Sequence, residues 1–313
     1  MSKSLVKSPA FWLGVAGAAA ISTGAAYYLR NKEEIDYYIR LYGVKREADK
    51  FYAAYPYLTK NIVYDPNLKP TLDVYRPESG SDYPVLIYVH GGSWNTGSKE
   101  LYAPAAQRLL PHGLVVVAVG YTLYPRATYR QQTAEVAAAI AWTLENIAGY
   151  GGDPKRVVVC TQSAGSQLAG LALFDEQWLA PLGHSVDEIA GFIGISGVYD
   201  IVAQYEFGQL TGQDGNFLIR VMEGEANFWD ASPVKYVRPG LPPALLIHGD
   251  ADQTVPIFAA DAFHDALIAS GNHSRYLIYE RGGHSEILFE ALTDPRQRLV
   301  KDMAGFVKAC APV

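Results

Sequence analysis

The chain has 313 residues, of which 49% are hydrophobic and 19% charged, a balance typical of a globular enzyme rather than of a disordered protein. Its formal net charge of -6, with no cluster of basic residues, excludes the electrostatic footprint of a nucleic-acid-binding protein. The two cysteines, Cys160 and Cys310, are too few for a disulfide framework or a cysteine-based metal site, and we expect no bound metal.

The N-terminal segment is long and uncharged. Residues 8–29 carry no charged side chain and are as long as the roughly 20 residues that a helix needs to cross a bilayer. We therefore predict that residues 1–30 form a hydrophobic helix that anchors the protein to a membrane. Two alternatives stay open: a signal peptide that is cleaved, which leaves a secreted protein, and a helix buried in a globular core.

Residues 31–58 follow with a helical pattern. Ile35, Tyr38, Ile39 and Tyr42 recur at helical spacing, which predicts an amphipathic helix that breaks near Gly43 and stops at Pro56. We expect this segment to be a helical cap or linker. The alternative is a helix that packs its tyrosines on a core.

From residue 59 to residue 313 the pattern is that of one catalytic domain. Two short alternating runs, NIVYDP and TLDVYRP, predict a β-hairpin. Short apolar runs then alternate with helical patterns, which predicts βαβ units and a mostly parallel sheet. These runs are YPVLIYVHGG, GLVVVAVGY, KRVVVCTQS, IAGFIGISG, PPALLIHGD and SRYLIYERGG. Residues 201–240 break this rhythm and read as an insertion over one face of the domain.

The ends of three predicted strands deliver a hydroxyl, a carboxylate and an imidazole. Ligands of parallel sheets bind at the carboxyl ends of the strands, so these groups are expected at one edge. Ser163 follows its strand directly and is the candidate nucleophile, with a helix-capping serine as the alternative. His284 is the only one of seven histidines that follows a strand on a Gly-Gly turn, so it is the candidate base. Asp252 is preferred over Asp250 as the orienting acid because it lies further along its loop.

The HGGSW stretch after the first long apolar run has its own chemical meaning. Consecutive glycines let the backbone approach a ligand, and backbone N–H groups stabilise a developing oxyanion. The candidate donors are the amides of Gly92, Ser93 and Ala164, and the alternative is a plain Gly-Gly turn. We expect Trp94 either to line the substrate pocket or simply to pack.

His90 and Thr161 lie next to the proposed oxyanion loop and the candidate nucleophile, respectively. His90 is expected to brace this loop rather than to act as a base. Thr161 occupies the place of the first glycine in the G-x-S-x-G pattern, which predicts strain or a slightly opened packing of strand against helix.

Taken together, the segments HGGSW, GYTLYP, YGGDPKRV, TQSAGS, HGDADQTVP and GGHS resemble the α/β-hydrolase superfamily over about residues 60–310. More narrowly, they resemble carboxylesterases of the hormone-sensitive lipase group and isoprenylcysteine methylesterases. The HGG-x-W pattern is also similar to that of kynurenine formamidases.

This resemblance implies an α/β-hydrolase fold, with an eight-stranded, mostly parallel sheet, helices on both faces and a cap from the N-terminal region and residues 201–240. It also implies no cofactor and a Ser163–His284–Asp252 triad that cleaves carboxylic esters, lipophilic or of short to medium chain length. An aryl-formamidase and a non-catalytic scaffold on the same fold remain the alternatives. The expected partner is a small ester, with no nucleic acid. The oligomeric state is left open.

Overall fold

The computed structural model describes residues 32–67, 69–288 and 298–310. The chain divides into two compact units, residues 1–46 and 47–313, and the division falls inside helix α2 (Lys32–Ala54). Within the described ranges, none of the helices combines the length and the apolar character that crossing a bilayer demands. The segment predicted as an anchor, residues 8–29, lies outside those ranges, so the membrane prediction stays a prediction.

Helix α2 corrects one expectation. It continues without a break through Gly43, where the sequence predicted an interruption. A single glycine costs a helix only about 1 kcal/mol, which the surrounding helix-favouring residues offset. The helix ends two residues before Pro56, as predicted, because a proline disfavours the helical conformation of the residue before it.

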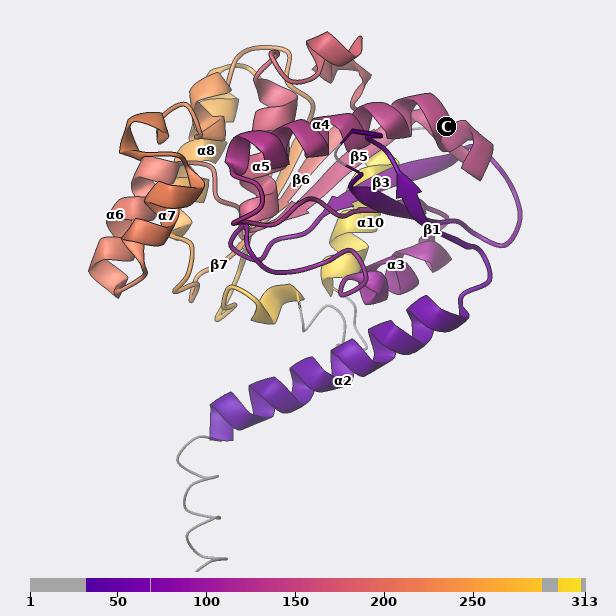
Figure 1. Ribbon diagram of the computed structural model, residues 1–313, viewed down its shortest axis with the longest axis horizontal. Coiled ribbons are helices and arrows are strands. Elements are labelled where there is room, and N and C mark those ends of the chain that lie inside the picture. The colour runs from indigo at the N-terminus through magenta and orange to yellow at the C-terminus, as the bar shows by residue number, and fades with distance from the viewer. Residues whose placement is uncertain (1–31, 68, 289–297, 311–313) are drawn as a thin grey trace, which may run out of the picture. The chain divides into compact units, whose positions relative to one another are not determined.

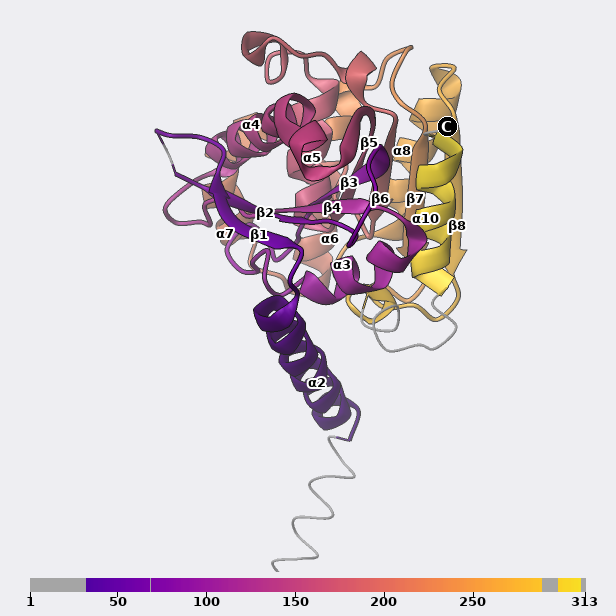
Figure 2. The same ribbon diagram turned by 90° about the vertical axis from the view of Figure 1, so that its right-hand side faces the viewer.

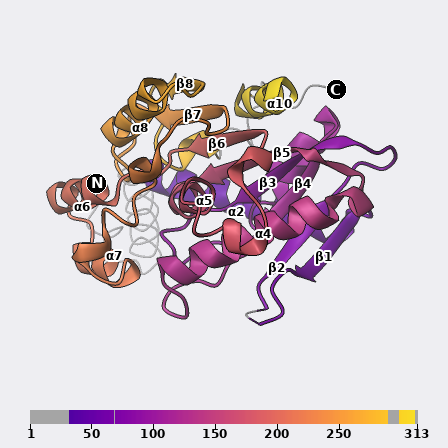
Figure 3. The ribbon, with the colours of Figure 1, turned by 90° about the horizontal axis from the view of Figure 1, so that it is seen from above.

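The larger unit is built on one eight-stranded sheet, which Figure 3 shows from above. The strand order is β1-β2-β4-β3-β5-β6-β7-β8. β1 pairs with β2, and β2 with β4, in antiparallel fashion, and all the other pairs are parallel. The predicted hairpin and the mostly parallel sheet are therefore confirmed. The strands are β1 (Leu58–Val63), β2 (Thr71–Tyr75), β3 (Tyr83–Val89), β4 (Val115–Val119), β5 (Gly152–Gln162), β6 (Gly191–Ile195), β7 (Ala244–Gly249) and β8 (Ser274–Tyr279).

Helices cover both faces of this sheet. The described helices of the larger unit are α3 (Ala103–Leu109), α4 (Tyr129–Asn146), α5 (Ala164–Phe174), α6 (Ile201–Thr211), α7 (Gly215–Val221), α8 (Ile257–Ala269) and α10 (Arg298–Cys310). Figure 2 shows α4 and α5 on one side of the sheet and α3 and α10 on the other.

Alternation along the strands feeds a separate core on each side. Val157 and Val159 of β5 pack with α4, α5 and α8, whereas Val158 and Cys160 pack with α3 and α10. Successive side chains of a strand point to opposite faces, so a continuous apolar run such as VVVC serves both cores.

The insertion at residues 201–240 lies between β6 and β7 and belongs to the same compact unit as the sheet. It contains α6, α7 and two short 3-10 helices, Glu225–Asn227 and Pro233–Tyr236. In Figure 1, α6 and α7 lie side by side next to α8. Asp200 begins α6 by accepting hydrogen bonds from the backbone N–H groups of Val202 and Ala203, which caps the helix.

Candidate active site

Ser163 lies on the sharp turn between β5 and α5. Its backbone has φ +52° and ψ -124°, in a region that residues with a side chain rarely adopt. Its N–H donates to the Ile195 carbonyl at 3.0 Å, and its own carbonyl accepts from the Ser166 N–H at 2.9 Å. These bonds hold the strained backbone in place, which is the geometry that exposes a nucleophile at the end of a strand.

Glycine at position 165 lets α5 approach the end of β3. A Cβ atom at Gly165 would lie 2.4 Å from the Val89 carbonyl oxygen and 2.5 Å from that of His90. Both atoms belong to backbone, so they cannot move aside cheaply. Packing therefore requires a glycine two residues after the serine.

Thr161 is accommodated by hydrogen bonds that sequence reasoning did not anticipate. Its hydroxyl donates to the Ile193 carbonyl at 2.9 Å, so the Ser166 hydroxyl, 2.8 Å away, donates to it in turn. In the sheet Thr161 pairs with Gly194 of β6, and the β5–β6 pairing continues in register through the next residue. The polar group is thus satisfied in a fully buried position.

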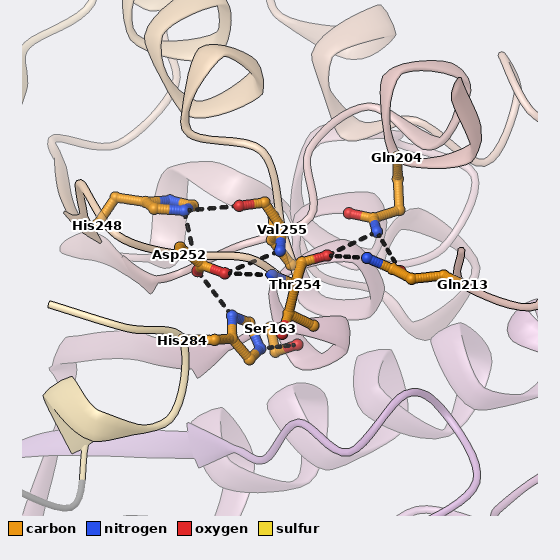
Figure 4. Close-up of polar contacts among 8 residues, drawn as sticks. All are labelled: Ser163, Gln204, Gln213, His248, Asp252, Thr254, Val255 and His284. Carbon is orange, nitrogen blue, oxygen red and sulfur yellow. Dashed lines mark hydrogen bonds and ion pairs between the residues drawn. The ribbon is translucent and has the colours of Figure 1, made fainter. Parts of the chain in front are cut away.

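Three of the predicted side chains meet at the carboxyl edge of the sheet (Figure 4). His284 Nε2 lies 2.9 Å from Ser163 Oγ, and His284 Nδ1 lies 2.8 Å from Asp252 Oδ2. Burial alone would raise the pKa of the Asp252 carboxyl, but hydrogen bonds from two histidines hold that pKa well below its usual range. Asp252 is therefore an anion in a buried position, facing the imidazole.

Asp250, the rival acid, has a different place. Its side chain accepts a hydrogen bond from the backbone N–H of Arg281, so it ties the loop after β7 to the loop that carries His284.

The loop predicted to hold the oxyanion is strained over three consecutive residues. Gly92, Ser93 and Trp94 all have positive φ, at +116°, +48° and +61°. The Gly92 carbonyl accepts the N–H groups of Asn95 and Thr96, which closes the turn. Over the described part of the chain, no hydrogen bond uses the N–H of Gly92, Ser93 or Ala164. The oxyanion role of these three groups stays a prediction.

Trp94 both packs and lines the pocket. Its side chain is buried, and its indole N–H donates to Gln167 Oε1 on α5 at 2.9 Å. The indole therefore anchors the strained loop to the helix that begins after Ser163.

His90 contacts the loop formed by residues 91–94 at its N-terminal end. Its Nδ1 lies 2.7 Å from the Gly91 carbonyl oxygen, and its ring stacks on Tyr121 at 4.4 Å between centroids. Burial lowers the pKa of His90 to about 4, so the ring is neutral at physiological pH. It is not placed to exchange protons with Ser163.

A cavity of about 200 Å³ opens beside Ser163. The insertion supplies much of its wall. Two glutamines of this wall, Gln204 and Gln213, each donate from Nε2 to the Thr254 carbonyl, at 2.9 and 3.0 Å (Figure 4). The insertion is thereby bonded to the loop that carries Asp252. The apolar lining consists of Trp94, Val198, Tyr205, Phe217, Leu218 and Val255.

Sequence reasoning did not single out His248. Its Nε2 lies 3.1 Å from Asp252 Oδ2, on the oxygen that also faces His284. The available signal was its position in HGDAD, four residues before Asp252, at the end of a strand that delivers functional groups.

Among the described residues, no group of three or more His, Cys, Asp or Glu side chains is placed to hold a metal ion.

The chain is similar in sequence and fold to several known proteins. A family model described as BD-FAE matches residues 72–267, which is more than half of the chain. "Isoprenylcysteine alpha-carbonyl methylesterase ICME" of Arabidopsis thaliana is 28% identical over 80% of this chain and 62% of its own length. "Esterase LipQ" of Mycobacterium tuberculosis is 32% identical over 78% of this chain and 60% of its own length. The chain thus spans a little under two thirds of the length of these curated relatives.

Among solved structures, the thermophilic carboxylesterase EstE1 from a metagenomic library superposes with a TM-score of 0.71 at 20% identity. The superposition covers 87% of this chain and 96% of that chain. The chain belongs to the BD-FAE family and has the α/β-hydrolase fold that carboxylesterases share.

Proposed function

We propose that this protein is a carboxylesterase that cleaves carboxylic esters by acyl transfer through Ser163, with His284 as the base and Asp252 as the orienting acid. The observation that carries the proposal is the unbroken hydrogen-bonded series Ser163–His284–Asp252, at 2.9 and 2.8 Å, whose serine lines a cavity. Relatives with matching sequence are named esterases and methylesterases, which supports the same class of reaction.

The first half of the reaction acylates the serine. Ser163 Oγ attacks the ester carbonyl carbon while its proton passes to His284 Nε2. The negative charge that develops on the carbonyl oxygen is stabilised by the N–H groups of Gly92, Ser93 and Ala164. His284 then gives the proton to the leaving alkoxide oxygen, the C–O bond breaks, and the acyl group remains on Ser163.

The second half releases the acid. A water molecule attacks the acyl carbon while His284 Nε2 takes a proton from the water. The ester bond to Ser163 then breaks as His284 returns this proton to the serine oxygen. Asp252 keeps the imidazole in the required tautomer and stabilises its protonated form in both halves.

The pocket supports esters with an apolar acyl or alcohol group of short to medium length. Its lining combines aromatic and aliphatic side chains with polar ones, and its volume of about 200 Å³ lies below the range of typical drug-sized sites. The HGG-x-W pattern also suits an aryl-formamidase, which would use the same residues. Rates on an aryl ester and the matched arylformamide separate the two activities, and we expect the ester to be the better substrate.

The serine is tested by substitution. We expect Ser163→Ala to lower kcat on p-nitrophenyl butyrate by about 10³-fold or more, because removal of a triad nucleophile leaves only residual catalysis by binding and the oxyanion donors. Ser166→Ala is the matched control, since that serine lies on the same helix but bonds Thr161. It should stay within about tenfold of the original enzyme.

Circular dichroism establishes that both variants fold. Mass spectrometry after treatment with a fluorophosphonate should locate the label on the peptide that contains residue 163. A folded Ser163→Ala protein with the original turnover would overturn the proposal.

We also propose that residues 8–29 attach the protein to a membrane. The proposal rests on the length of this uncharged segment and on its position before the folded unit.

A further inference from the structure

A second histidine contacts the carboxylate that the proposed mechanism places behind His284. His248 lies near the end of β7, and its side chain is 1% exposed. Its Nε2 lies 3.1 Å from Asp252 Oδ2, the same oxygen that lies 2.8 Å from His284 Nδ1. Two imidazole rings therefore share one carboxylate oxygen (Figure 4).

The surroundings of His248 determine which ring nitrogen carries its proton. Nε2 also lies 3.2 Å from the Val255 carbonyl oxygen, so both of its neighbours are acceptors. The Asp252 carboxylate has no hydrogen to give, because its pKa is held far below its usual range. Nε2 must therefore be the donor. Nδ1 of the same ring is buried and, among the described residues, has no partner that would accept a second proton.

The bond from His248 completes the set of donors around the carboxylate. Asp252 Oδ1 accepts the backbone N–H groups of Thr254 and Val255, at 2.8 and 2.9 Å, and Oδ2 faces the two rings. A carboxylate offers about four lone-pair sites. Here Oδ1 has two donors, and Oδ2 faces two ring nitrogens, with the single Nε2–H of His248 shared between Oδ2 and the Val255 carbonyl. Because Val255 gives its N–H to Oδ1 and its carbonyl to His248, the ring fixes the loop and the carboxylate together.

We propose that His248 is a positioning residue for the hydrolysis: its Nε2–H holds Asp252 Oδ2 in line with the Nδ1–H of His284. This inference rests on the function proposed above. His248 acts through Asp252 and not on the substrate. Without this contact the carboxylate keeps its two backbone bonds at Oδ1, but Oδ2 is held only by His284, so it is aligned less closely with the ring whose tautomer and charge it sets.

Two amide substitutions form a matched pair. His248→Gln places its amide nitrogen where Nε2 stands, whereas His248→Asn places its amide nitrogen at the position of Nδ1, too short to reach Asp252. We expect His248→Asn to lower kcat on p-nitrophenyl butyrate by about 10- to 100-fold, by analogy with the loss of a group that orients a metal ligand. KM should change little, and His248→Gln should restore most of the loss.

The pH profile separates positioning from a general structural role. When Asp252 no longer faces His284, the protonated ring is less stable, so the acidic limb of kcat/KM moves to lower pH in His248→Asn. His248→Gln should keep the original limb. The other ionisable side chains of the two loops, Asp250, Glu280, Arg281 and Glu286, are the same in both variants.

A measurement on the unaltered protein guards against a variant that does not fold. Nitrogen-15 NMR of labelled histidine reads the tautomer of each ring, with His248→Gln used to assign the signal. Protonation of His248 at Nε2 supports the inference, and protonation at Nδ1 overturns it. A folded His248→Asn enzyme with the original kcat and the original limb also overturns it, as does an equal loss in both variants.

The unaltered enzyme and Ser163→Ala are measured alongside. If both turn over esters equally, the proposed function fails. If turnover depends on Ser163 but not on His248, only the positioning role fails.

Discussion

The buried ring of His90 gives the free energy of unfolding a pH dependence. Burial lowers the pKa of this histidine to about 4 in the folded protein, against about 6.5 for an exposed histidine. Between these values the unfolded chain binds a proton that the folded protein does not. The stability is therefore full above about pH 6.5 and falls as the pH is lowered toward 4.

We expect acidification from about pH 7.5 to about pH 5 to remove about 2 kcal/mol from the free energy of unfolding through His90. His90→Phe keeps a ring against Tyr121 but cannot titrate, so its stability should fall less over this range. Urea unfolding at the two pH values measures the difference, and the exposed His273→Gln is the control. An equal loss in His90→Phe and the unaltered protein would contradict this assignment.

At the level of single residues, the sequence predicted best those site residues whose place follows from chain order and from a position just after a strand. Each strand of a parallel sheet delivers the residue that follows it to one edge, so Ser163, Asp252 and His284 were expected to meet, and the structure places them within hydrogen-bond distance. His248 was missed because its contact depends on how the loop curls back over the end of β7. The path of this loop after β7 cannot be predicted from the spacing of residues in the sequence.

At the element scale, the periodicity of apolar residues predicted the strands and the helices that cover them. Continuous apolar runs became strands buried on both faces, and the hairpin at β1 and β2 formed as expected. The predicted break in α2 was wrong because one glycine does not interrupt a helix whose neighbours favour it. Helices α6 and α7 had no clear signal, since their apolar residues face a pocket as well as a core.

Replacement by alanine is predicted to have opposite effects at two helical glycines, Gly165 in α5, which contacts the end of β3, and Gly305 in α10, which faces open space. At Gly165 a methyl group would meet backbone oxygens at 2.4 and 2.5 Å, so Gly165→Ala should lower the free energy of unfolding by about 1–3 kcal/mol. It should also lower kcat, because Ala164 is displaced with the helix. Gly305 in α10 has nothing within 4 Å of its would-be Cβ, so Gly305→Ala should raise stability by about 0.5–1 kcal/mol.

Urea unfolding and ester turnover of both variants check these signs. Gly165→Ala with unchanged stability would mean that α5 can move away from β3 at no cost.

At the scale of the whole molecule, the sequence predicted that residues 201–240 insert into one domain instead of forming a second. It did not predict which of them line the pocket, because that depends on the path of α6 and α7 relative to the strand ends. The bonds from Gln204 and Gln213 to Thr254 are of this kind, since they join residues 50 and 41 positions apart in the chain.

The proposed membrane attachment is also a property of the whole chain. We expect the full-length protein to sediment with membranes, to resist release by high salt and to be released by detergent. Removal of residues 1–31 should move the ester-hydrolysing activity to the supernatant. Mass determination of the N-terminus tests the signal-peptide alternative, because a protein that has lost this segment in cells would contradict the anchor.

The chain leaves the sheet after β6, builds the pocket wall and returns to β7, while those two strands keep their alignment through their own ladder of hydrogen bonds. Additions or deletions within residues 201–240 therefore leave the ends of β6 and β7 in place. Under the proposed function, most of the substrate-facing wall can therefore vary within residues 201–240 while Ser163 and His284 stay on other segments, and the bonds of Gln204 and Gln213 to Thr254 are the constraint on that variation.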